Sequence, residues 1–176
     1  MIRRLAPALL LAALALAPAA RAKTPGEVGV GQPLREATLQ GLNGPPRKLS
    51  DFRGKPLIIN VWASWCGPCR AETASLERLA WSDAARGVTI IGVSTDDYPQ
   101  AAQSWLKASN ATFNHFIDRR LELENMLGAD KLPLTVLVGA DGRVVDKVFG
   151  ARQWDSPESL RLIERAFRAG GAAPRR

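Results

Sequence analysis

The stretch Asn60–Thr73, "NVWASWCGPCRAET", contains both cysteines of the chain, Cys66 and Cys69. It overlaps the continuous apolar run 56–62, which is typical of a buried central strand. Over residues 69–86, leucine and alanine recur at helical spacing among charged side chains, which predicts a helix. The two thiols therefore lie where a buried strand passes into a helix.

The elements around this junction predict an α/β fold. After the strand at 56–62 and its helix, a second buried strand is expected at 88–96 and a second helix at 99–109. Four elements are then expected in turn: a short strand (112–118), a short helix (121–128), a hairpin (134–150) and a capped terminal helix (156–170). The order gives a parallel β-α-β half and an antiparallel β-β-α half, which form a mixed central sheet flanked by helices.

The segment before the first buried strand predicts a small extension of this sheet. Two short alternating stretches around residues 43–44 indicate an N-terminal hairpin. Residues 49–55 then favour a short helical turn, with Ser50 or Asp51 as its cap.

The ends of the chain differ from its middle. Residues 1–22 have two early arginines, an apolar run and small residues at the end, which is typical of a secretory signal peptide; residues 5–20 could instead stay in the inner membrane as an uncleaved anchor. The apolar run has about 13 residues, fewer than the ~20 that a spanning helix needs. We expect a linker over 23–34, one domain over 35–170 and a flexible tail over 171–176.

The charge of the chain excludes one class of partner. The formal net charge is +7, but the basic residues are scattered and do not alternate with aromatic ones. Nucleic-acid binding is therefore not expected. We expect a monomer exported to the periplasm.

Three kinds of site could use two thiols at this spacing. A structural staple is a poor use of the pair, because closing a four-residue loop stabilises by only about 2 kcal/mol. A metal clip could hold Cu(I), as in a copper chaperone, but other ligands are few: the single histidine, His115, reads as an ordinary strand or loop residue. The third is a redox couple, either a reductase or a general disulfide oxidase or isomerase.

Redox chemistry uses every residue of the motif. At a helix N-terminus, free N–H groups and the helix dipole favour the thiolate of Cys66, which is the form that attacks a disulfide. Cys69, one turn later, can then displace the partner from the mixed disulfide. Gly67 allows close backbone approach, and Pro68 lacks an N–H that the first turn could not pair.

The motif "VWASWCGPCRAE" is similar to the active-site signature of the thioredoxin superfamily. The signal peptide, the pair Arg70 and Glu72, and the lead-in "NGPPRKLSDFRGK" resemble the exported TlpA/ResA branch. The resemblance covers roughly residues 35–168 and implies a thioredoxin-like fold. It also implies a thiol-disulfide oxidoreductase with no cofactor beyond the Cys66–Cys69 disulfide.

The resemblance also implies roles for single residues. Pro133 matches the family's cis-proline, and the backbone of Leu132 before it would pair with the incoming peptide. Trp65 would form an apolar wall of the substrate groove. Where thioredoxins bury an aspartate this chain has Asn60, and Glu72 matches the glutamate thought to replace it as the acid-base group of the second cysteine. The alternative for Glu72 is a carboxylate that only stabilises the first turns of its helix.

Two positions depart from the family pattern, because Thr73 and Leu134 stand where a proline and a threonine are usual. The helix is therefore expected to bend less, and the groove to fit different partners. Three tryptophans, Trp81, Trp105 and Trp154, are expected to serve packing only.

The dipeptide between the cysteines predicts the direction of electron flow. Gly-Pro supplies no charge and no side-chain donor to stabilise the reduced thiolate, so the protein is expected to be a reductant. In an oxidising compartment a reductant needs an electron source. The resemblance points to a membrane thiol-disulfide transporter as donor, and to apocytochrome c or a copper-delivery protein as the disulfide-bearing substrate.

Overall fold

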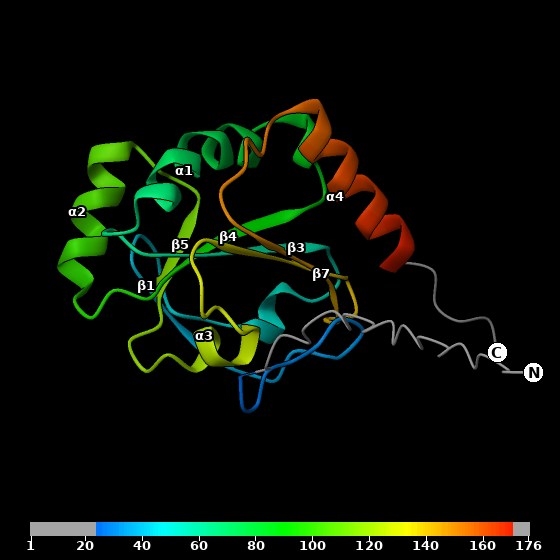
Figure 1. The fold of residues 1–176 in the computed structure, drawn as a ribbon, viewed down its shortest axis with the longest axis horizontal. Helices are drawn as coiled ribbons and strands as arrows, with labels where there is room; N and C mark the ends of the chain where they lie inside the picture. Colours follow the sequence, from blue (N-terminus) through cyan, green and yellow to red (C-terminus); the bar gives the residue numbers. More distant parts are fainter. Residues whose placement is uncertain (1–23, 171–176) are drawn as a thin grey trace, which may run out of the picture.

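The computed structural model describes residues 24–170, which form a seven-stranded sheet with helices on both faces (Figure 1). The strands are β1 (Thr38–Gly41), β2 (Arg47–Lys48), β3 (Leu57–Trp62), β4 (Thr89–Ser94), β5 (Asn114–Ile117), β6 (Leu134–Val138) and β7 (Val144–Phe149). The helices are α1 (Gly67–Ala80), α2 (Pro99–Ser109), α3 (Glu122–Leu127) and α4 (Pro157–Gly170), with 3₁₀ turns η1 (Leu49–Phe52) and η2 (Asp83–Ala85). The expected signal peptide or anchor and the expected tail lie outside the described residues.

The sheet is mixed, as predicted. Its order is β2-β1-β5-β4-β3-β6-β7; β3, β4 and β5 are parallel, whereas β6, β7 and β1 run antiparallel to their neighbours. The two halves join where β6 pairs with β3. The N-terminal hairpin is confirmed as the pair β1–β2. No helix within 24–170 is long and apolar enough to cross a membrane.

Both faces of the sheet are covered by apolar side chains. On one face α1 and α4 pack over the sheet, and on the other lie α3, η1 and the lead-in to β1 (Figure 1). All six residues of β3 are buried, which explains why its sequence is continuously apolar rather than alternating. The motif follows this most protected strand.

Two local predictions were wrong. The helix after the cysteines ends at Ala80, not residue 86, because the N–H and hydroxyl of Ser82 both donate to the carbonyl of Leu79 (3.0 and 2.8 Å) and close its last turn. The cap of the turn η1 is Lys48, not Ser50 or Asp51. Asp51 instead occupies the third position and accepts a hydrogen bond from the Lys48 N–H at 3.0 Å.

The described part of the expected linker 23–34 packs on the domain. Val28 is buried and its N–H donates to the Met126 carbonyl at 2.8 Å. The Glu27 carboxylate forms an ion pair with Lys147 at 2.6 Å, and both side chains are largely shielded from water. Periodicity could not show this, because the segment binds through backbone groups and isolated side chains.

The single histidine lies in the core, as an ordinary strand residue. His115 in β5 is 3% exposed and its ring contacts Trp62 and Phe113. A side chain at Gly92 would collide with this ring, since a Cβ there would lie 2.2 Å from Nδ1. Neither ring nitrogen has a hydrogen-bond partner within the described residues.

The burial of His115 predicts an acid-sensitive fold. Burial lowers the pKa of His115 from 6.5 to about 3, against the opposing charge of Glu77. Below pH 6.5 the unfolded chain takes up a proton on His115 that the folded protein does not bind. The free energy of unfolding is therefore unaffected by this group above pH 6.5 and falls by about 1.4 kcal/mol per pH unit below it. Urea unfolding at pH 7, 6 and 5 should show this loss, and His115→Leu should flatten it; equal slopes for both proteins would contradict the prediction.

Candidate active site

The register of the sheet brings distant loops to one edge. Parallel strands end on the same side, and the pairs Trp62–Ser94 and Ser94–Ile117 put the ends of β3, β4 and β5 level. β6 runs the opposite way and begins at that edge, where Leu134 pairs with Val61. The cysteines, the loops after β4 and β5, and the segment before β6 are therefore neighbours, as ligand sites at strand ends commonly are.

The two cysteines form a disulfide across the first turn of α1. The S–S distance is 2.07 Å and the Cα–Cα distance 5.3 Å. Cys66 is the N-cap of the helix, and its sulfur accepts a hydrogen bond from the Cys69 N–H at 3.2 Å. The helix begins at Gly67 and Pro68, as the motif predicted. The positive end of the helix dipole and an N–H donor thus both face the Cys66 sulfur.

The two sulfurs differ in access. Cys66 is 5% exposed and lines a cleft of about 610 Å³, whereas Cys69 is 2% exposed and is not part of the cleft wall. The cleft is lined by Trp65, Cys66, Gly67, Pro68, Thr95, Asp97, Leu121, Glu124, Ala129, Asp130 and Leu132. A partner that enters it meets Cys66 first.

The cleft brings together most of the residues that the sequence singled out. Trp65 is 71% exposed at its edge, and Gly67, Pro68 and Leu132 form part of its wall. The Leu132–Pro133 peptide bond is cis, as expected, but Pro133 itself is buried behind the wall.

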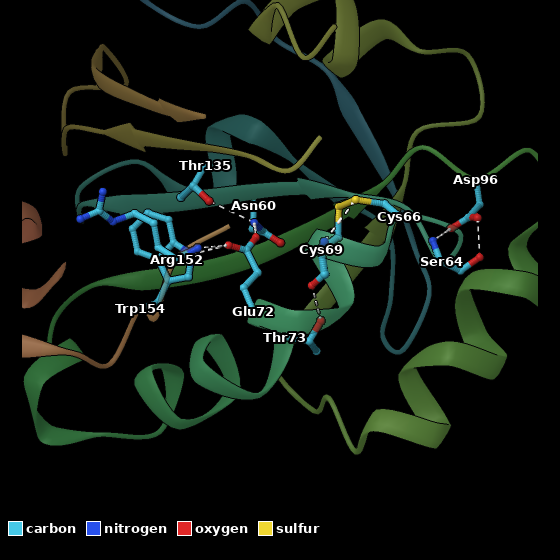
Figure 2. Close-up of a disulfide and its surroundings, with 10 residues drawn as sticks. All are labelled: Asn60, Ser64, Cys66, Cys69, Glu72, Thr73, Asp96, Thr135, Arg152 and Trp154. Carbon is cyan, nitrogen blue, oxygen red and sulfur yellow. Dashed lines mark hydrogen bonds between the residues drawn. A yellow bond between two sulfur atoms is a disulfide. The ribbon is translucent and has the colours of Figure 1, made fainter. Parts of the chain in front are cut away.

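A buried carboxylate that sequence reasoning missed fixes the loop before Cys66. Asp96 accepts hydrogen bonds from the Ser64 N–H (2.9 Å) and the Ser64 hydroxyl (2.7 Å), which Figure 2 shows beside the disulfide. The Ser94 hydroxyl donates to the same carboxylate at 2.7 Å. The loop after β4 therefore holds the loop that carries Trp65 and Cys66. The only sequence signal is an acidic residue at the end of the expected buried strand 88–96.

Glu72 lies one helical turn beyond Cys69 and is buried, with 2% exposure. Residues three apart share a helix face, so its carboxylate and the Cys69 sulfur lie on the same side of α1 (Figure 2). Glu72 Oε1 accepts from the Asn60 amide at 2.8 Å, and the second N–H of that amide donates to the Thr135 hydroxyl at 3.0 Å. Because Asn60 is an amide, Glu72 is the carboxylate of this hydrogen-bonded pair.

The other oxygen of Glu72 is held from the connector between β7 and α4. Oε2 accepts from the Arg152 backbone N–H at 3.0 Å and from Trp154 Nε1 at 2.9 Å (Figure 2). Burial raises the pKa of Glu72 above 4.5, and the hydrogen bonds from Trp154, Arg152 and Asn60 oppose that rise. Trp154 therefore does more than pack, contrary to the expectation from sequence. This contact could not be predicted from the sequence, because Trp154 is a single tryptophan 82 residues from Glu72 and belongs to no local pattern.

The departures from the family pattern have local consequences. α1 runs without a break through Thr73, whose hydroxyl donates to the Cys69 carbonyl at 3.0 Å. Leu134 is fully buried in the same core cluster as the apolar residues of α3, and it is not part of the cleft wall. Among residues 24–170, no group of three or more metal-ligating side chains gathers at this site or elsewhere.

Comparison with known proteins agrees with this geometry. The Redoxin family model matches residues 29–160. The chain is 30% identical to the thiol-disulfide oxidoreductase ResA of Geobacillus thermodenitrificans, over 70% of this chain and 71% of the relative. It is 33% identical to the thiol:disulfide interchange protein DsbE of Pseudomonas aeruginosa, over 69% and 67%.

A solved structure extends the likeness to the fold. A secreted disulfide oxidoreductase of Mycobacterium tuberculosis, described as homologous to E. coli DsbE, superposes with a TM-score of 0.62 at 28% identity, over 74% of this chain and 93% of that one. The chain therefore belongs to the Redoxin family, as a thiol-disulfide oxidoreductase of the ResA/DsbE type.

Proposed function

We propose that this protein is an exported reductase that transfers two electrons from its dithiol to the disulfides of specific periplasmic proteins. One observation carries the proposal: the disulfide spans the first turn of α1, with Cys66 open to the cleft and Cys69 enclosed behind it. An attacking sulfur that a partner can reach through the cleft and a sheltered resolving sulfur are what a two-step exchange requires.

In the first step, the reduced Cys66 thiolate attacks one sulfur of the partner's disulfide. A mixed disulfide forms, and the partner's other sulfur leaves as a thiolate. In the second step, the Cys69 thiolate attacks the Cys66 sulfur and releases the partner's second thiolate. The partner gains two electrons and two protons, and the Cys66–Cys69 disulfide is restored. Trp65, Gly67, Pro68 and the backbone of Leu132 and Pro133 would hold the partner's peptide beside the sulfur.

Glu72 would take the proton from Cys69. An enclosed thiol must lose its proton before it can attack, so it needs a base within the protein. Glu72 is a buried carboxylate on the same helix face, one turn away. This gives it a function beyond helix stabilisation.

The partners follow from the chemistry and from the family. The secreted relative supports export, which we assign to a signal peptide at residues 1–22 or an anchor at residues 5–20. Apocytochrome c with oxidised haem-site cysteines or a copper-delivery protein would be the substrate. A membrane thiol-disulfide transporter would return the protein to its dithiol form.

Single cysteine variants separate the two sulfurs. In Cys69→Ser, the mixed disulfide cannot be resolved, so partner proteins should remain covalently attached and be recovered on non-reducing gels. Cys66→Ser should trap none, because the attacking sulfur is missing. Equal trapping by both variants would contradict the assigned order of attack.

The reduction potential tests the direction of electron flow. Equilibration of the purified protein with mixtures of reduced and oxidised glutathione should give a value nearer −270 mV than −120 mV, roughly the two ends of the range for this fold. A value near −120 mV would identify an oxidase instead.

Glu72→Gln tests the proton acceptor. The amide keeps the size of the side chain but cannot accept the Cys69 proton, so the resolving step should slow by roughly 10²-fold at neutral pH. The rate of Cys66 attack should be unchanged. Rapid-mixing kinetics of the reduced variant with a small disulfide would measure both; an unchanged resolving step would leave Glu72 a structural residue.

A further inference from the structure

The two oxygens of Glu72 are held differently. Oε2 accepts two hydrogen bonds, from the Arg152 backbone and from the Trp154 indole, whereas Oε1 accepts one, from Asn60. Each carboxylate oxygen has about two acceptor positions. Oε2 is therefore filled, and one position is left on Oε1.

Trp154 cannot turn away from this contact. Its side chain is fully buried against the core beneath α1 and α4. Its backbone N–H donates to the Ser75 hydroxyl at 3.0 Å, and that hydroxyl donates to the Glu72 carbonyl at 2.7 Å. An ion pair between Arg78 and Asp155 at 2.6 Å fastens the connector to α1 once more. The indole N–H is thus aimed at Oε2 by both packing and backbone.

We infer that Trp154 is a positioning residue for proton transfer at Cys69, an inference that rests on the proposed role of Glu72. The indole N–H holds Oε2, keeps the enclosed carboxylate ionised, and leaves Oε1 as the atom that receives the proton. The Cys69 S–H bond breaks, the proton passes to Oε1 directly or through one water, and the thiolate formed attacks the Cys66 sulfur.

The energetic reason is the burial of the charge. Burial raises the pKa of Glu72, and the Trp154 indole is the largest of the influences that lower it again. Without this N–H, less of the carboxylate would be ionised near neutral pH. The resolving step would then need a higher pH to reach the same rate.

The test uses the full chain, reduced with dithiothreitol and then freed of it. One equivalent of 5,5′-dithiobis(2-nitrobenzoate) releases one thionitrobenzoate when Cys66 attacks and a second when Cys69 resolves, so the two steps appear as two absorbance phases. In Trp154→Phe the first phase should stay within twofold of the wild type. The acidic limb of the second phase should move up by roughly one pH unit, which is about a tenfold slower rate on that limb.

Two further variants give the control and the coupling. Trp81→Phe is the control, because it also removes an indole N–H that donates to a glutamate, Glu77 at 2.8 Å. Trp81 is exposed at the other end of α1 from the cysteines, so this variant should change neither phase. Glu72→Gln should abolish the acidic limb, and Glu72→Gln combined with Trp154→Phe should behave as Glu72→Gln alone, since Trp154 acts through Glu72.

The outcomes separate the two ideas. If Glu72→Gln keeps a normal second phase with its pH dependence, both the role of Glu72 and the inference on Trp154 are wrong. If Glu72→Gln loses the limb but Trp154→Phe keeps its midpoint, only the inference on Trp154 is wrong.

A measurement on the unaltered protein covers the case in which Trp154→Phe does not fold. The indole ¹⁵N–H resonance of Trp154 should shift with pH, with the same midpoint as the acidic limb. The reason is that protonation of Glu72 weakens the hydrogen bond from the indole N–H to Oε2. A resonance that does not move over that pH range would overturn the inference.

Discussion

A carboxyl group enclosed near the disulfide, that of Glu72, is the constraint on which the site depends. A buried carboxylate is tolerated only when hydrogen bonds replace the water it has lost, and one unpaired buried group costs about 1–3 kcal/mol. Glu72 meets this condition with donors from β3 and from the connector after β7. The strand, the helix that carries the sulfurs and the C-terminal connector must therefore all be in place before the carboxylate is stable.

The same requirement explains why Asn60 suits its position. A second carboxylate there would lie within hydrogen-bond distance of Glu72, and two such charges cannot both remain ionised at that separation. An amide avoids this repulsion and supplies a donor. Its orientation is set by the Thr135 hydroxyl, which takes its other N–H. The position is thus complementary to Glu72 rather than a lost proton relay.

The sequence predicted the parts of the molecule that local rules control. The buried strand β3, the helix after the cysteines, the β6–β7 hairpin and the motif at the N-terminus of α1 all follow from periodicity, turn residues and cap preferences. It failed where a long-range contact decides. Trp154 reaches Glu72 across 82 residues, and Asp96 holds Ser64 across 32, so neither leaves a pattern within one segment.

The segment before β1, which contains Val28, also makes long-range contacts that the sequence did not predict. These contacts have a mechanical consequence. The backbone of Val28 is bonded to Met126 in α3, and α3 supplies Glu124 to the cleft wall. The opening segment of the folded chain and one side of the cleft therefore form a single braced unit. A force applied to the chain near Val28 would pass through the hydrogen bond to Met126 into α3, and along α3 to Glu124 in the cleft wall.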